Sequence, residues 1–319
     1  MYIPDDSLRD NTTLTAVDGI RVGHWQDDDA ETGCTVILCP DAGCLASGEI
    51  RGSAPGSRET ALLEPEKSVE RVFAVTLAGG SAFGLAAAQG VTDYLGERNI
   101  GYDTPYARVP IVPAAVIYDL SVGDPKIRPT AASGYTAASR ASAAPVALGR
   151  VGVGTSSSCG KYLGPEFAER SGLGSAALRV QGATVAALSV ANPFGDIVDP
   201  DDGTVVAGAR LADGRRPGRD TMHDFFAGDV PDGGGTNTTL VVVATDARLS
   251  KAQAKHLAQS AHVGIARVTR PSHTVFDGDS SFVLSTLRGP EVALFQLSVA
   301  VQEVVAQAIL AGARALPSR

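Results

Sequence analysis

Short apolar runs separated by glycine- and proline-rich turns dominate the hydrophobic pattern of this chain. Runs of β-branched and aliphatic residues predict strands near 14–25, 34–39, 72–77 and 183–190. Apolar residues with helical spacing predict helices near 84–98, 130–145, 250–263 and 291–315. Because the two kinds of segment alternate throughout, the pattern predicts one α/β domain, residues 1–319, of layered sheets and helices.

Three segments between these elements have less regular patterns. Residues 109–120 contain two prolines, which predicts an edge or irregular strand ending at Tyr118. The turn at 78–84 is glycine-rich, which favours close helix–strand packing, although its amides could also hold an anion. Residues 151–164 form a Gly/Ser loop around Lys161, which is either a surface charge or part of a site.

The sharpest change of pattern lies where Gly233-Gly234-Gly235 gives way to a buried strand beginning at Thr238. The Thr238 hydroxyl follows Asn237, so it could attack that carbonyl, shift the acyl group from nitrogen to oxygen and lose it to water. The freed α-amino group, with an ordinary pKa of about 7.7 to 8, could then act as general base for the same hydroxyl. The polar segment 213–236 would be free to move away after the cut.

Two observations keep other interpretations of these motifs open. Threonine is common at strand starts for steric reasons, and residues 11–14 repeat the tetrapeptide 237–240 without the glycines or the long strand. Asp277 and Asp279 lie two apart, so an extended chain would place both carboxylates on one side. The pair is therefore either a turn of solvated acids or part of a site with Lys161 or an α-ammonium group.

Composition argues against two classes of binding partner, nucleic acids and membranes. With 319 residues, 44% hydrophobic content, a net charge of -8 and a pI near 5.1, the chain lacks the basic surface that nucleic acids and anionic membranes require. The acidic run 27–31 predicts a solvated turn. Polar residues interrupt the long apolar segment 292–310, which indicates a core helix rather than a membrane span.

Cysteine and terminal patterns give no sign of a metal, a cofactor or export. The cysteines form no Cys-x-x-Cys pair and have no histidine at ligand spacing, so we expect buried free thiols in a reducing compartment: Cys34, Cys39, Cys44 and Cys159. The first residues contain no basic region followed by an apolar stretch, so a cytoplasmic location is expected. No metal and no cofactor are predicted.

Several motifs together resemble the DmpA-type family of self-cleaving peptidases (L-aminopeptidase/D-esterase and β-aminopeptidase), including its nylon-oligomer hydrolase (NylC) branch. The resemblance covers nearly the whole chain. Its parts, in order, are Val22-Gly23-His24, Gly33-Cys34-Thr35-Val36, Gly56-Ser57-Arg58-Glu59-Thr60, residues 77–85, residues 109–119, Gly160-Lys161, Asn192-Pro193, Asn237-Thr238-Thr239 and Asp277-Gly278-Asp279.

The resemblance implies a four-layer αββα sandwich of the DmpA/ArgJ-like, N-terminal-nucleophile-hydrolase type. It implies self-cleavage between Asn237 and Thr238, which would give pieces 1–237 and 238–319, and a homo-oligomer, with a tetramer expected. Carried over by position, the implied catalytic residues are the nucleophile Thr238, the carbonyl-polarising or oxyanion-holding groups Tyr118 and Asn192, and the charged cluster of Lys161, Asp277 and Asp279.

The expected activity is hydrolysis of small peptides or amides through an acyl-enzyme on Thr238. Many aminopeptidases of the family have serine at the cleavage point, whereas Thr238 with Thr239 is more similar to the nylon-oligomer branch. An endo-acting hydrolase of 6-aminohexanoate oligomers is therefore one alternative. Another is an acyltransferase of the ornithine-acetyltransferase type, and a third is an uncut, non-catalytic binding protein.

Overall fold

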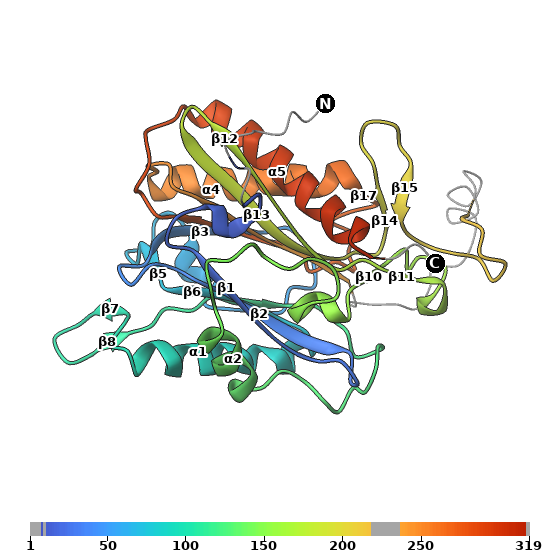
Figure 1. Ribbon diagram of the computed structural model, residues 1–319, viewed down its shortest axis with the longest axis horizontal. Coiled ribbons are helices and arrows are strands. Elements are labelled where there is room, and N and C mark those ends of the chain that lie inside the picture. The colour runs from blue at the N-terminus through green and yellow to red at the C-terminus, as the bar shows by residue number, and fades with distance from the viewer. Residues whose placement is uncertain (1–7, 9–10, 218–236, 317–319) are drawn as a thin grey trace.

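Four layers of secondary structure make up the fold (Figure 1). Helices α4 (Lys251–Val268) and α5 (Leu294–Arg314) cover one face of a six-stranded sheet. Helices α1 (Ala87–Gly96) and α2 (Ala131–Ser139) cover a five-stranded sheet on the opposite side of the molecule. This αββα order agrees with the expected sandwich. The computed structural model describes residues 8, 11–217 and 237–316.

The two large sheets differ in how their strands are connected. The six-stranded sheet has the order β12 (Leu173–Val180), β13 (Ala183–Asn192), β16 (Thr238–Thr245), β18 (Ser280–Ser285), β3 (Cys44–Ile50) and β5 (Arg71–Val72). The five-stranded sheet has the order β1 (Arg21–Asp27), β2 (Thr32–Leu38), β6 (Ala74–Ala78), β9 (Ala114–Val116) and β4 (Ser57–Arg58).

Short strands form the remaining sheets. One pairs β10 (Ser158–Cys159) with β11 (Glu169–Arg170), another pairs β7 (Tyr102–Asp103) with β8 (Arg108–Val109), and a third joins β14 (Asp196–Val198), β15 (Val205–Ala207) and β17 (Thr269–Arg270). Short 3-10 helices occupy Leu14–Ala16, Ala61–Leu63, Ser81–Ala86, Gly152–Thr155 and Pro165–Phe167.

Strand β16 is buried on both faces, and its alternating side chains enter two different cores. Val241 and Val243 pack under α4 and α5, whereas Leu240 and Val242 lie between the two sheets. Because side chains on a strand alternate, Thr238 shares the face of Leu240 and points between the sheets. The strand therefore delivers its first hydroxyl to the inter-sheet layer.

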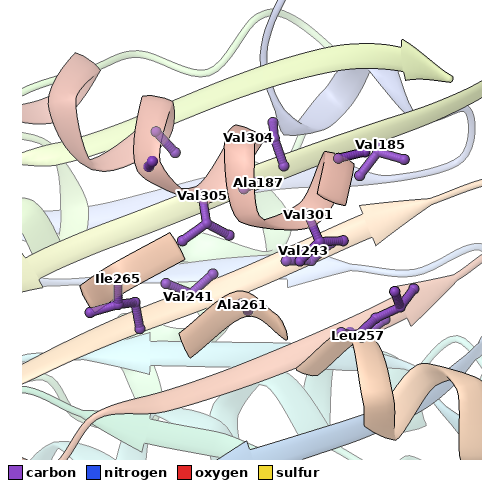
Figure 2. Packing of buried hydrophobic residues seen from close by; sticks show 14 of the residues in the cluster. Val185, Ala187, Val241, Val243, Leu257, Ala261, Ile265, Val301, Val304 and Val305 are labelled. Atoms are coloured by element: carbon purple, nitrogen blue, oxygen red, sulfur yellow. The ribbon is translucent and has the colours of Figure 1, made fainter. Parts of the chain in front are cut away.

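Helix α5 is a core helix. Its valines Val301, Val304 and Val305 face the strand residues Val185 and Val243 across the layer (Figure 2). By length and composition this helix would also pass as a membrane span, the single such helix within the described residues. It packs against α4, β12 and β13 as one of the two outer helices, with Phe295 and Val299 exposed, so it contributes to the core through one face and is not enclosed between layers.

Three strands of the six-stranded sheet, β3, β12 and β18, were not predicted from the sequence. Strands β3 and β12 are rich in small residues of low strand propensity. In β12 the reason is a close approach: a Cβ on Gly174 would lie 1.9 Å from the backbone oxygen of Ala308 in α5. Small residues therefore allow the helix to pack directly on this strand, which a pattern of large apolar residues would not reveal.

Other boundaries also differ from the predicted ones. Residues 109–120 form an irregular strand rather than an edge strand, because β9 covers only Ala114–Val116, ends before Tyr118 and lies between β6 and β4. Helix α2 ends at Ser139 rather than near 145, α4 continues five residues beyond 263, and β13 runs on to Asn192. The last difference matters because it places Asn192 inside the sheet.

Several smaller expectations are confirmed. All four cysteines are buried free thiols. Asp28 and Asp29 lie exposed in a turn, as expected for the acidic run, although Glu31 forms ion pairs with two arginines described below. The glycine run 233–235 and most of the polar segment 213–236 lie outside the described residues.

Candidate active site

Thr238 opens strand β16 at the centre of the larger sheet and is only 4% exposed. Its Oγ1 donates a hydrogen bond to the carbonyl oxygen of the preceding residue, Asn237. The hydroxyl therefore lies beside the carbonyl that it would have to attack in self-cleavage. Directly opposite on β13 is Asn192, paired with Thr238 in the antiparallel register.

The Asn237 carbonyl has a second donor, which the sequence analysis missed. The backbone N–H of Gly278 donates to this oxygen at 2.8 Å. A Cβ on Gly278 would lie 2.8 Å from Thr238 Oγ1 and 2.6 Å from the Ala54 oxygen, so no larger residue fits. A backbone amide aimed at a carbonyl stabilises negative charge that develops on its oxygen.

Asn192 is the centre of a hydrogen-bond network at the end of β13. Its side-chain oxygen accepts from the Lys161 ammonium at 2.7 Å and from the Ser158 amide at 3.1 Å. Its side-chain nitrogen donates to the carbonyl of Tyr118 at 3.2 Å. With the oxygen held by two donors, the amide has one orientation, and its NH₂ group carries one further N–H beyond that given to Tyr118.

Lys161 is held against Asn192, because its Nζ also donates to that residue's backbone oxygen at 3.1 Å. Burial lowers the pKa of the Lys161 ammonium to about 7, and the charges of Asp277 and Asp119 oppose this shift. Near neutral pH this amine can therefore exist in either protonation state. The Gly/Ser loop thus brings Lys161 into the site rather than onto the surface.

Asp277 and Asp279 are fully buried, so the first of the two interpretations left open, a turn of solvated acids, is wrong. Asp277 accepts from the amide and hydroxyl of Thr274, at 2.7 and 2.6 Å, and from the Phe194 amide at 3.3 Å. Burial, followed by the charge of Asp279, raises the pKa of the Asp277 carboxyl, although these hydrogen bonds oppose the shift. Because each carboxylate has its own hydrogen-bond donors, both can be buried in the same short segment.

The second carboxylate of this pair, Asp279, has a histidine partner that the sequence analysis did not find. His273 Nδ1 lies 2.7 Å from Asp279, and its Nε2 lies 3.3 Å from the carbonyl of His262. Both ring nitrogens face acceptors, which only the imidazolium form satisfies with two N–H groups. Burial would lower the pKa of His273, but its contact with Asp279 outweighs that effect and raises the pKa.

Tyr118 joins the site through its backbone, since its carbonyl holds the Asn192 amide. The next residue, Asp119, is a buried carboxylate that was also missed. It accepts from the amide of Gly80 at 2.6 Å and from the hydroxyls of Ser156 and Thr32 at 2.7 and 2.8 Å. The glycine-rich turn therefore does bind an anion, but the anion belongs to the protein itself.

The polar loop near residue 54 closes the far side of the site. The amides of Arg51 and Ala54 donate to the carbonyls of Asp279 and Asp277 at 3.0 Å each. Of the predicted residues, Thr238, Asn192, Lys161 and the two aspartates thus lie in one contiguous set of contacts. In the described part of the chain, no group of three or more His, Cys, Asp or Glu side chains could hold a metal.

Sequence comparison identifies relatives over almost the whole chain. The model of peptidase family S58 matches residues 12–316. An uncharacterized aminopeptidase of Mycobacterium tuberculosis is 40% identical, covering 94% of this chain and 93% of its own. A 6-aminohexanoate-oligomer endohydrolase of Paenarthrobacter ureafaciens is 34% identical over 84% of this chain and 73% of its own.

Solved structures agree on the fold. The L-aminopeptidase D-Ala-esterase/amidase of Ochrobactrum anthropi, a variant of the Ntn hydrolase fold, matches 95% of this chain and 86% of its own, with a TM-score of 0.72 at 19% identity. A β-aminopeptidase of Burkholderia sp. matches 94% and 86%, with a TM-score of 0.69 at 22% identity. The expected N-terminal-nucleophile-hydrolase fold is confirmed. The chain therefore belongs to peptidase family S58, the DmpA-type family, and is an enzyme that hydrolyses amide or peptide bonds.

Proposed function

We propose that this enzyme cuts itself between Asn237 and Thr238 and then uses Thr238 as an N-terminal nucleophile on small peptides or amides. The products of the cut are segments 1–237 and 238–319 of one α/β domain. The observation that supports this most directly is the environment of the Asn237 carbonyl. It accepts hydrogen bonds from both the Thr238 hydroxyl and the Gly278 amide.

Self-cleavage begins when Thr238 Oγ1 attacks the Asn237 carbonyl carbon. The C–N bond breaks, the proton lost by the hydroxyl ends on the departing nitrogen, and an ester joins Asn237 to the Thr238 side chain. The Gly278 amide stabilises the oxyanion of the tetrahedral intermediate. Water then hydrolyses the ester, which releases the Asn237 carboxylate and leaves Thr238 with a free α-amino group.

Substrate hydrolysis repeats this chemistry with an external amide. The α-amino group of Thr238 takes the proton from its own hydroxyl as Oγ1 attacks the substrate carbonyl, and then gives that proton to the departing amine. The acyl group remains on Thr238 as an ester until water, deprotonated by the same amine, displaces it. No cofactor or metal is required by this sequence of steps.

The neighbouring groups have separate roles in this scheme. The second N–H of the Asn192 amide serves the oxyanion, and the Tyr118 carbonyl fixes the orientation of that amide. Lys161, with a pKa near 7, exchanges protons at the edge of the site. Asp277 and Asp279 hold the backbone amides of Phe194 and Thr239 and provide negative charge opposite the new α-ammonium group.

Mass spectrometry of the purified protein tests the proposal. Two pieces whose masses correspond to 1–237 and 238–319 are expected, and the Thr238→Ala variant is expected to remain one inactive chain. The proposal would be contradicted if the wild-type chain stayed intact and both it and Thr238→Ala hydrolysed amides at the same rate. A wild-type chain that is intact and inactive would favour the binding-protein alternative.

A second candidate is an endo-acting hydrolase of ω-amino-acid oligomers. It is favoured by the 34% identity to a 6-aminohexanoate-oligomer endohydrolase. Linear oligoamides with blocked amino termini distinguish the two, since an aminopeptidase needs a free amino end and an endohydrolase does not. Transfer of the acyl group to an added amine in preference to water would instead identify an acyltransferase. The expected cytoplasmic homotetramer is tested by cell fractionation and light scattering.

A further inference from the structure

A line of hydrogen-bonded groups connects helix α4 to the strand of the proposed nucleophile, and His273 lies at its centre. The ring nitrogen Nε2 of His273 lies 3.3 Å from the backbone oxygen of His262 in α4, and Nδ1 lies 2.7 Å from Oδ2 of Asp279. The other oxygen of Asp279 accepts the Thr239 N–H at 2.6 Å. Thr239 directly follows Thr238 in β16, so the line ends one residue from the attacking hydroxyl.

The backbone of His273 has an uncommon conformation. Its φ is 54°, in the left-handed region that residues with a side chain rarely adopt. The Asp279 oxygen that contacts the ring also accepts the His273 backbone N–H at 3.2 Å. Conformations of this kind persist only where the surrounding structure holds them, and they concentrate at functional sites. One carboxylate oxygen therefore holds both the ring and the backbone of His273.

The surroundings of the His273 ring favour its positive form. The titratable and charged groups around it lie on three segments: Asp277 and Asp279 before β18, His262 on α4, and the paired Glu49 and Arg51 at the end of β3. The His262 ring packs edge-on at 4.9 Å between centroids, and because burial lowers its pKa to about 4 it is neutral near pH 7. The two aspartates are therefore the charges that act most directly on His273.

Loss of the ring proton would break this line of contacts. As an imidazolium, His273 has two ring N–H groups, one for Asp279 and one for the carbonyl of His262. The neutral ring has a single N–H, so one of its nitrogens would then face an oxygen with no hydrogen between them. The side chain of His273 is 20% exposed, so its proton can leave for solvent, whereas that of Asp279 is 2% exposed.

We propose that His273 is a positioning residue for the reactions of Thr238: its imidazolium form fixes Asp279 and, through the Thr239 amide, the start of β16. This inference rests on the proposed self-cleavage and amide hydrolysis, and it adds an alkaline limit to both. The contact with Asp279 raises the pKa of His273 above its ordinary value of about 6.5. The imidazolium is therefore present below the raised pKa, and its effect is lost as pH rises through that value.

The first test is the rate of self-cleavage of freshly synthesised chains as a function of pH, followed by mass spectrometry. His273→Asn keeps a side-chain N–H donor and suits a left-handed backbone, but it has no charge and does not titrate. We expect the wild-type rate to fall as pH rises through the His273 pKa. The variant should be slower by about tenfold or more below that pKa and should lack the fall. His256→Asn, at an exposed histidine of α4, is the matched control and should behave as the wild type does.

The second test assigns the titration, because Lys161 also changes its charge near neutral pH. Long-range ¹H–¹⁵N spectra of the histidine-labelled Thr238→Ala chain measure the His273 pKa directly. Agreement of this pKa with the midpoint of the fall that His273→Asn lacks supports the proposal. In the same uncut chain, Asp279→Asn is expected to lower the His273 pKa. This measurement does not depend on the folding of His273→Asn, and an unchanged pKa overturns the proposal.

The remaining outcomes separate this inference from the function on which it rests. A rate and a pH profile of His273→Asn equal to those of the wild type overturn the positioning role and leave self-cleavage established. A variant that is slower by one constant factor at every pH, with the fall retained, shows that His273 only supports the fold and also overturns it. A wild-type chain that stays uncut at every pH contradicts the proposed function, and this inference with it.

Discussion

Asp279 holds the backbone of Thr239, the residue that follows the proposed nucleophile. One carboxylate oxygen accepts the Thr239 N–H at 2.6 Å, and the other accepts from the ring and the amide of His273. Both partners are donors, so the carboxylate links the start of β16 to the loop that precedes β18. The carboxylate therefore fixes the position at which Thr238 enters the sheet.

Replacing Asp279 with asparagine tests this relationship. The substitution keeps the size of the side chain but removes its charge, and its NH₂ group would face a donor. We expect the free energy of unfolding to fall by about 1–3 kcal/mol and self-cleavage to slow. Urea denaturation in a Thr238→Ala background measures the free energy of unfolding, since unfolding then involves one continuous chain. A mass-spectrometric time course of the variant with Thr238 intact measures the rate of self-cleavage.

The matched control for that variant is Asp202→Asn. Asp202 is exposed, and its hydrogen bonds to Thr204 are local, so neither stability nor cleavage should change measurably. Similar behaviour of the two variants would contradict a special role for Asp279.

Gly278→Ala is expected to block self-cleavage. The new Cβ would lie 2.8 Å from Thr238 Oγ1 and 2.6 Å from the Ala54 oxygen, so the nucleophile or the amide that polarises the Asn237 carbonyl must move. Displacements of about 1 Å at a reacting centre cost on the order of a hundredfold in rate. The rate of appearance of the two pieces measures the effect. Gly96→Ala, where a Cβ meets no atom within 4 Å, should cleave at the wild-type rate.

Stability should depend on pH through Lys161. Its pKa is about 7 in the folded protein and near 10.5 when the chain is unfolded, so between these values the unfolded state binds more protons. The free energy of unfolding should therefore rise as pH increases from about 7 to 10 and fall as pH drops toward 7. Lys161→Gln should remove this component, whereas Lys126→Gln, at an exposed lysine, should keep it. Parallel pH profiles for wild type and Lys161→Gln would show that the ammonium is not desolvated.

Sequence pattern predicted the layers of this fold because its central strands and helices carry continuous or periodic apolar residues. The run from Leu240 to Ala244 identifies β16 without any tertiary information. Strand β12 escaped detection because its glycine and alanines serve the approach of α5, which is a property of two elements together. The prolines of residues 109–120 correctly predicted an irregular strand, but they do not define which strands flank it, so its place inside the sheet was not predicted.

In the candidate site, as in the fold, local sequence predicted some features and missed those that depend on tertiary contacts. The strand signal and the preceding asparagine identified Thr238 as a candidate, and resemblance supplied Asn192, Lys161 and the aspartates. No local pattern could show that antiparallel register places Asn192 opposite Thr238. His273 belongs to none of the motifs, and Asp119 ends the motif 109–119 without having been singled out as a site residue. The partners of Asp119 lie at least 37 residues away along the chain, and the contact of His273 with Asp279 depends on the turn between them, so a local pattern reveals neither.

Asp119 provides a test of positioning through the backbone. Its carboxylate accepts from the Gly80 amide and from two hydroxyls, and it directly follows Tyr118, whose carbonyl orients the Asn192 amide. Asp119→Asn presents an NH₂ group to these donors, so we expect kcat of the processed enzyme to fall about tenfold or more with little change in KM. Asp124→Asn, at an exposed turn, is the control. A loss of stability with kcat unchanged would mean that Asp119 supports only the turn at Gly80 and leaves the reacting groups unaffected.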